Sequence, residues 1–290
     1  MDQKFHESLE KFMSEHNPKD MDEANELLQE FIKLYNAGEL DYEDSPLVQA
    51  YELLGKARYA KSDKERIKLV KKALEVCPDC LEAKLILATN SDRPIKVLQK
   101  VNECILEEKG RLKKEGYFAK ENIGHFYGIY ETRPYIHAMY SLANMYANAG
   151  MINKAIDLCK EILRLNEHDN TGTRYLLMGL YAYKEELDNM NQLYKKYKEE
   201  DLHMLVPFMI YYFKQGDYKN ALKYLERIKK VNKNFVSFFE EEMDTDPVMP
   251  DAYSIGDMSE VESVIAELEF LFSSVPGISE LILEDDILEE

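Results

Sequence analysis

Apolar residues recur at spacings of three and four along most of the chain, which is the spacing of one face of an α-helix. The clearest early run comprises Ala24, Leu27, Leu28, Phe31, Ile32 and Tyr35. Asp20 and Glu23 form a capping box ahead of this run and Gly38 follows it, so the pattern predicts an amphipathic helix between them. A preceding helix that ends near Asn17-Pro18 is predicted from Phe5, Leu9, Phe12 and Met13.

From Pro46 onward the pattern becomes a series of helices joined by very short turns. The predicted helices span about 47–60, 64–77, 80–90, 93–114, 135–149, 152–166, 171–184, 187–199, 202–214 and 218–232. Short connections force consecutive helices to lie antiparallel, and no long segment alternates as a strand does. The sequence therefore predicts an all-α protein built as a string of helical hairpins.

Two stretches of the chain repeat the same order of small and large residues. The first, in 136–169, comprises Leu142-Ala143, Tyr146, Gly150, Ala155, Cys159 and Ile162. The second, in 202–235, comprises Phe208-Met209, Tyr212, Gly216, Ala221, Leu225 and Ile228. A degenerate copy between them comprises Leu177-Met178, Tyr181, Met190, Tyr194 and Tyr197. Small residues let the two helices of a hairpin approach, and stacking buries what one hairpin cannot bury alone.

This helix–turn–helix unit resembles the tetratricopeptide (TPR) repeat, and Ala73-Leu74-Glu75-Val76-Cys77-Pro78 looks like the end of a further copy. The resemblance implies a right-handed α-solenoid of TPR-like hairpins with helical caps at both ends. The expected organisation is an N-terminal helical pair over 1–45, a repeat array over 46–235, and an acidic helical cap and tail over 236–290.

A finer resemblance covers about residues 70–270. A little-characterised set of bacterial TPR proteins is similar at His125-Phe126-Tyr127-Gly128, Glu131-Thr132-Arg133-Pro134-Tyr135, Leu165-Asn166, Asp169-Asn170, Gly172 and Arg174-Tyr175. The C-terminal part of the suppressor-of-tumorigenicity-type TPR proteins resembles Asn232, Val236 and Tyr253-Ser254-Ile255-Gly256. The resemblance implies an interaction protein and supplies no catalytic residues.

Composition and charge narrow the classes of function. A hydrophobic content of 45% with only 12 Gly and 9 Pro excludes wholesale disorder. The formal net charge is −18, and residues 235–290 hold 17 acidic residues and no Lys or Arg. This balance argues against direct binding of nucleic acid. The absence of a long apolar run and of a signal-peptide pattern predicts a soluble, cytoplasmic protein with no membrane partner.

Candidate chemistry is sparse. Cys77-Pro78-Asp79-Cys80 has the spacing of a redox pair, but helical sequence flanks it and no second such pair completes a zinc site, so a helix–helix turn is favoured. His125 and His137 flank Glu131 without a metal-binding or acid–base motif. The sequence predicts a protein that is not an enzyme and needs no metal or cofactor.

The TPR resemblance also implies which residues face a concave groove. The inner-helix positions of the successive copies are His137, Tyr140, Asn144 and Asn148, then Tyr175 and Tyr183, then His203, Ile210 and Lys214. Asn amides can pair with the backbone of an extended peptide, and Tyr rings supply contact area at low entropic cost. The carboxylate clamp of chaperone-binding TPR proteins requires Lys where Tyr140 stands, which disfavours a chaperone co-factor role.

A second candidate cluster lies near the hairpin ends and comprises Glu131, Arg133, Asp169, Asn170 and Arg174. Two Arg near two carboxylates are expected to form a buried network that locks adjacent hairpins, with an anion or ligand site as the alternative. Asp169-Asn170 is also expected to cap a helix that starts at Thr171.

The function predicted from these features is a non-enzymatic protein- or peptide-binding adaptor that uses the concave face. One alternative is a regulator controlled by a small peptide or by its own acidic tail. Another is an acidic mimic that occupies a nucleic-acid-binding protein. The apolar stripe from Ser259 to Phe272 predicts a capping helix, and the acidic stretch from Ile278 to Leu288 either completes this cap or acts as a docking peptide.

Overall fold

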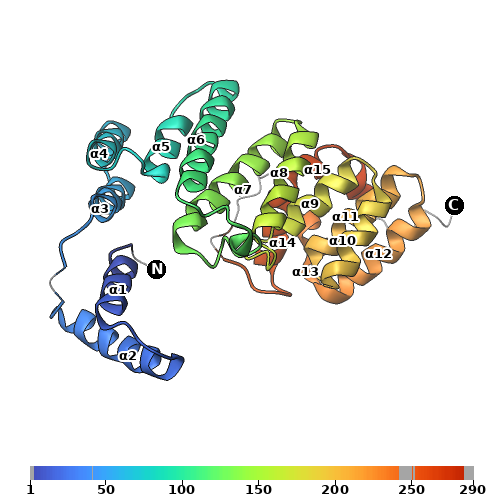
Figure 1. The fold of residues 1–290 in the computed structure, drawn as a ribbon. Helices are drawn as coiled ribbons and strands as arrows, with labels where there is room; N and C mark the ends of the chain where they lie inside the picture. The colour runs from blue at the N-terminus through green and yellow to red at the C-terminus, as the bar shows by residue number, and fades with distance from the viewer. Residues whose placement is uncertain (1–2, 41, 242–249, 251, 284–290) are drawn as a thin grey trace. The chain divides into compact units, whose positions relative to one another are not determined.

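The computed structural model describes residues 3–40, 42–241, 250 and 252–283. Within these residues every regular element is helical, apart from an isolated bridge between His125 and Asn166. The prediction of an all-α protein is confirmed for the residues that the structure describes. The chain divides into two compact units, Met1–Glu108 and Lys109–Glu290, whose helices are drawn in Figure 1.

The first unit opens with the helical pair α1 (Gln3–His16) and α2 (Met21–Ala37). Phe31 is fully buried against Phe5 and Phe12, with ring centroids 5.2 and 5.5 Å apart. The side chain of Asp20 accepts from the backbone of Asp22 and Glu23, which is the cap that the sequence predicts. Aromatic packing and this cap together hold the pair.

The rest of the first unit comprises α3 (Pro46–Arg58), α4 (Asp63–Val76), α5 (Leu81–Thr89) and α6 (Pro94–Lys114), the last of which runs on into the second unit. Small residues fill the α3–α4–α5 core, and its buried members are Ala50, Leu54, Ala57, Val70, Ala73, Cys80 and Ala83. Cys77 ends α4 and Cys80 precedes α5, and both are free thiols in a helix–helix turn. Burial raises the pKa of the Cys80 thiol to about 11, which disfavours the reactive thiolate.

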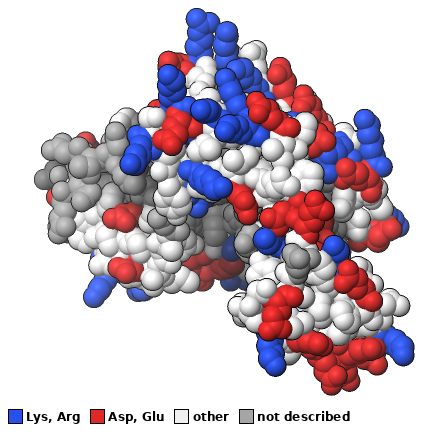
Figure 2. Space-filling model, turned by 90° about the vertical axis from the view of Figure 1, so that its left-hand side faces the viewer, with Lys and Arg blue, Asp and Glu red and all other residues white. Residues whose placement is uncertain are grey.

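Charge is unevenly distributed over the first unit. Figure 2 shows a dense group of Lys and Arg side chains on one part of the face in view, with Asp and Glu both among them and elsewhere on that face. On α4, Lys64, Lys68, Lys71 and Lys72 are exposed and make no ion pair among the described residues. These lysines form a solvated face of the helix.

Three hairpins form most of the second unit. They are α7 (Arg133–Asn148) with α8 (Ile152–Leu165), α9 (Thr173–Tyr183) with α10 (Leu187–Tyr197), and α11 (Leu202–Lys214) with α12 (Tyr218–Val231). Each begins and ends within two residues of its prediction. Helix α9 packs between α7 and α11, and α8 packs on both α7 and α9. The hairpins are therefore stacked in chain order, with α7, α9 and α11 as neighbours.

The small residues of the repeat pattern lie where the helices approach. Ala143, Ala155 and Cys159 are fully buried between α7 and α8, and Ala221 is fully buried in α12. Gly150 and Gly216 end their first helices with φ of 71° and 68°, a left-handed conformation that glycine adopts without strain. The pattern therefore marks both the close contacts and the turns.

The C-terminal part contains α13 (Asn234–Glu241), α14 (Met258–Glu267), α15 (Glu269–Phe272) and α16 (Ile278–Leu283). The predicted stripe from Ser259 to Phe272 forms α14 and α15, with a break at Leu268. Helix α14 contacts α11 and α13, while α15 contacts α9 and α7 (Figure 1). The two helices thus lie over all three hairpins. The acidic end from Glu284 onward lies outside the described residues.

Candidate functional site

The candidate site is the surface formed by α7, α9 and α11, which we call the inner surface. Helices α14 and α15 of the same chain lie on it. Their apolar stripe is buried, with Val261, Val264, Leu268 and Leu271 each 0% exposed. Much of the surface that the sequence assigns to a partner is therefore in contact with the chain's own C-terminal segment.

The closest apolar fit joins Gly179 of α9 to Leu268 at the junction of α14 and α15. A Cβ atom on Gly179 would lie 2.5 Å from Leu268 Cδ2 and 3.4 Å from Phe270 Cζ. Real Cβ atoms do not approach other atoms as closely as 2.5 Å, so the missing side chain of Gly179 creates the notch that Leu268 fills. This notch places the segment at one position along α9.

A polar contact lies at the centre of the same interface. The Tyr140 hydroxyl on α7 donates to Glu267 Oε1 on α14, and Glu267 Oε2 lies 3.4 Å from Nε2 of His203 on α11. The side chains of Glu267 and His203 are only 8% and 2% exposed. A carboxyl group, an imidazole and a phenol from three helices therefore meet away from solvent.

Burial shifts the proton affinities of this pair in opposite directions. It raises the pKa of Glu267 to about 7, with Asp169 and Asp201 adding to the effect, and lowers the pKa of His203 to about 4. At neutral pH the imidazole is therefore neutral, and Glu267 retains a proton over much of the range in which a free carboxyl is ionised. Between pH about 4 and 7 the pair therefore holds close to one proton, and the Tyr140 hydroxyl, whose pKa burial also raises, remains a donor.

If Glu267 and His203 share one proton, single substitutions at these two positions should change how the stability of the protein depends on pH. With both residues present, we expect stability to be nearly flat between pH about 5 and 6, because the folded and unfolded pairs each hold close to one proton there. In Glu267→Gln only the depressed His203 titrates, so stability falls as pH falls through this range. In His203→Gln only the raised Glu267 titrates, so stability falls as pH rises. The maximum slope is about 1.4 kcal/mol per pH unit for each variant.

Urea unfolding at several pH values measures these slopes. The neighbouring groups that act on Glu267 or His203 are Tyr140, Asp169, Arg174 and Asp201, all of which are retained in both variants. Slopes of the same sign in Glu267→Gln and His203→Gln would contradict a shared proton.

A larger polar network surrounds the start of α9. Arg174 pairs with Asp169 at 2.9 Å and with Glu199 through two hydrogen bonds of 2.7 and 3.2 Å, and it also donates to Tyr175 Oη at 2.8 Å. Tyr175 in turn donates to Asp201 at 2.9 Å, and its ring lies 4.6 Å from that of His203. The network thus links the helix α9 to the turn between α10 and α11.

The predicted charged cluster is joined only in part. Asp169 and Arg174 form the expected ion pair, whereas Arg133 donates to the carbonyl of Tyr127 at 2.6 Å and lies over the rings of Tyr127 and Tyr130. Glu131 lies in the short 3-10 helix Tyr130–Thr132, and Asn170 is exposed. Helix α9 begins at Thr173, two residues after the predicted Thr171, and its N-cap residue is Gly172 rather than Asp169 or Asn170. The Asp169 carboxylate still caps the first turn from a distance, because it accepts from the backbone N–H groups of Thr173 and Arg174.

The remaining predicted partner-binding residues lie in different surroundings. Asn148 and Tyr183 line an open cavity beside α15, described below. His137 is exposed and lies 5.6 Å from the ring of Tyr127, while Asn144 donates to the carbonyl of Tyr140 within α7. Ile210 is fully buried, and Lys214 donates to the carbonyl of Tyr183 at 2.6 Å.

Two buried carboxyl groups that hold α14 in place, those of Glu260 and Glu267, are absent from the predicted site residues. Glu260 is fully buried and accepts from Asn232 at 3.0 Å and from the backbone of Gly256 at 2.7 Å. Asn232 also donates to the carbonyl of Asp257 at 2.8 Å. The only sequence signal is an acid inside the apolar stripe from Ser259 to Phe272, and Glu267 shares this signal. An acidic residue inside an apolar helical stripe therefore indicates a buried polar contact with another part of the protein.

No protein-family model matches the chain, and a search of curated proteins finds no match. No described helix combines the length and the apolar character that a bilayer-spanning segment requires.

Proposed function

We propose that the protein is a non-enzymatic, TPR-type adaptor that binds a protein or peptide on the inner surface of α7, α9 and α11. We further propose that its own segment α14–α15 acts as an internal ligand that limits access to this surface. The proposal joins the adaptor interpretation to a variant of the regulator alternative, in which α14–α15, rather than the acidic tail, occupies the surface.

The observation that carries the proposal is the manner in which α14 and α15 are held. A short amphipathic segment contributes an apolar stripe, the Leu268 knob in the Gly179 notch and a carboxyl group bound by Tyr140. Helix-in-groove recognition uses the same combination of spaced apolar anchors and a few placed polar contacts. A surface that holds one amphipathic helix in this way has the chemistry to hold another.

The magnitude of this packing explains why access would be regulated. Burying a large aliphatic side chain contributes about 1.5–3 kcal/mol, and the segment buries several of them. Because the segment is tethered, its effective concentration at the surface is on the order of millimolar. An external partner therefore needs high affinity, or a condition that weakens the docking of α14.

The other alternative, an acidic mimic of nucleic acid, remains a prediction. Two acidic residues of the 235–290 region, Glu260 and Glu267, are buried inside the protein and are not available to a partner. Such a mimic would have to use the other carboxylates of 235–290, and its binding would fall steeply as salt increases.

A cut in the connection before α14 tests the adaptor proposal. A protease site introduced within residues 242–249 allows full-length protein to be cleaved while all its parts are present. We expect the cleaved protein to stay folded and to exchange its own segment for a labelled peptide of residues 252–283. We also expect it to capture a partner from host lysate more efficiently than uncut protein does.

Matched controls separate binding from loss of structure. A peptide carrying Leu268→Asp should fail to exchange, because a carboxylate cannot enter the apolar notch at Gly179. Capture of the partner should fall in Tyr140→Ala/Asn144→Ala protein, which alters the inner surface itself. If the body of the protein unfolds whenever the segment leaves, the segment is a constitutive part of the core and the regulated adaptor is wrong.

A further inference from the structure

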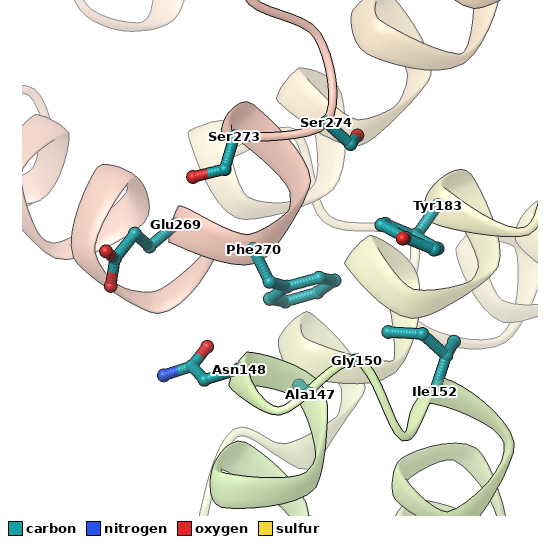
Figure 3. Close-up of a pocket in the computed structure, with 9 residues that line it drawn as sticks. All are labelled: Ala147, Asn148, Gly150, Ile152, Tyr183, Glu269, Phe270, Ser273 and Ser274. Atoms are coloured by element: carbon teal, nitrogen blue, oxygen red, sulfur yellow. The ribbon is translucent and has the colours of Figure 1, made fainter.

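An open cavity of about 290 Å³ lies where α15 meets the hairpins. Figure 3 shows its lining, which is Ala147, Asn148, Gly150, Ile152, Tyr183, Glu269, Phe270, Ser273 and Ser274. These residues come from the α7–α8 turn, from the end of α9, and from α15 with the turn after it. The cavity therefore exists only while α15 is docked.

The cavity has an apolar side and a polar side. Phe270 and Tyr183 lie with ring centroids 6.1 Å apart near Ile152, while Glu269 and Asn148 lie together on the other side of Phe270 (Figure 3). The side chains of Glu269, Asn148 and Ser273 are exposed and make no hydrogen bond or ion pair within the described part of the chain. Three polar side chains without a partner in the described part of the chain therefore line the open side of the cavity, beside the aromatic rings.

The charge of the cavity favours a cation. Glu269 is the only charged residue in the lining. The nearby Lys214 does not neutralise it, since its ammonium group is bound to the carbonyl of Tyr183 at 2.6 Å and to Glu185 at 3.1 Å. Aromatic faces also attract cations. Lys214 Nζ already lies 5.2 Å from the centroid of the Tyr183 ring, so the ring that offers a face to a ligand cation is that of Phe270. An anionic ligand would meet an unpaired carboxylate and no cation in the lining.

We propose that this cavity binds an arginine side chain of a partner peptide. Its volume is near the lower limit of about 300 Å³ for ligand pockets, which suits one long side chain rather than a large cofactor. The aliphatic stem lies against Ile152 and Phe270, and the guanidinium group reaches the Glu269 carboxylate. Arginine is favoured over lysine because its planar group stacks on aromatic rings and pairs with a carboxylate through two hydrogen bonds.

The exposed rim explains why the arginine belongs to a peptide. Asn148, Glu269 and Ser273 are exposed at the mouth, so the main chain of the ligand stays outside and the amide of Asn148 is available to it. This inference goes beyond the proposed adaptor function and does not depend on it. The adaptor partner needs α15 displaced, whereas the arginine ligand needs α15 docked, so the two ligands bind opposite states of the protein.

The test uses full-length protein with isotope-labelled isoleucine methyl groups. The probe is acetyl-Leu-Arg-Leu-amide, and its matched neutral probe carries citrulline in place of arginine. We expect the arginine probe to shift the Ile152 methyl signal and to bind about 5-fold more tightly than the citrulline probe. In Glu269→Gln the two probes should bind equally, while in Glu280→Gln, a change at an exposed acid of α16 outside the cavity, the difference should persist.

The same spectra contain the results that would overturn the proposal. It is wrong if Ile152 does not respond, if other isoleucines respond instead, or if arginine and citrulline probes bind equally to unchanged protein. If free guanidinium ion binds as tightly as the tripeptide, the cavity is a site for a small cation and the proposal of a peptide ligand is wrong. Spectra of each variant without probe establish that it is folded. Failure of the segment to exchange in the cleavage experiment would leave these results unaffected, so the two proposals fail separately.

Discussion

Asp169→Ala should lower the stability of the second unit by about 3–5 kcal/mol, because it breaks a buried ion pair and a helix cap together. The Asp169 side chain is 0% exposed, and it accepts hydrogen bonds from the backbone of Thr173 and Arg174 and from the Arg174 guanidinium at 2.8–3.0 Å. Alanine also disfavours the left-handed backbone at this position, where φ is 49°. Hydrogen exchange of the α9 amides measures the loss locally.

Asp169→Asn separates the contributions to this loss. Asparagine tolerates the left-handed backbone, and its amide oxygen can still accept from Thr173. Burial raises the pKa of Asp169, so removing its charge also removes a desolvation cost. We expect a loss of about 1–2 kcal/mol for Asp169→Asn and less than about 0.5 kcal/mol for the exposed neighbour Asn170→Ala. Equal losses for Ala and Asn at position 169 would show that the backbone and cap contribute nothing.

The helices themselves could be predicted because the signals that define them are local. The repeat of Ala143, Gly150 and Ala155 specifies a close hairpin contact on both sides of a turn, all within one short stretch. The cap at Asp20 depends on neighbours only two and three residues away. Short turns then leave few arrangements open to consecutive hairpins. Element type and order follow from such information without knowledge of distant contacts.

The partners of the site residues could not be predicted, because they are set by packing between distant segments. The phenol of Tyr140 finds its acceptor in Glu267, 127 positions away, and Arg174 takes Glu199 as well as its predicted neighbour Asp169. Arg133, which the sequence assigns to the same charged cluster, donates instead to the carbonyl of Tyr127. A single sequence lists the charged residues but does not say which of several carboxylates reaches each cation.

The strongest test of the covered inner surface uses Gly179 and Leu268. Leu268→Ala should cost about 2–5 kcal/mol, since it empties a fully buried site. Gly179→Ala in otherwise unchanged protein should also destabilise, by about 0.5–2 kcal/mol, because the new Cβ would lie 2.5 Å from Leu268 Cδ2. Leu268 is buried, so its side chain has little room to yield. Urea unfolding of the four proteins of this double-mutant cycle measures the coupling.

The decisive result is a change of sign. Alanine is favoured over glycine in a helix by about 1 kcal/mol, so Gly179→Ala should become stabilising once Leu268→Ala has removed the clash. Gly55→Ala in α3 is the matched control, because nothing lies within 4 Å of its added Cβ, and it should stabilise whether residue 268 is Leu or Ala. If Gly179→Ala stabilises the unchanged protein as Gly55→Ala does, Leu268 does not occupy the notch, and α14 and α15 do not cover the inner surface in solution. A sign change confined to position 179 ties the C-terminal segment to α9 without any appeal to a partner.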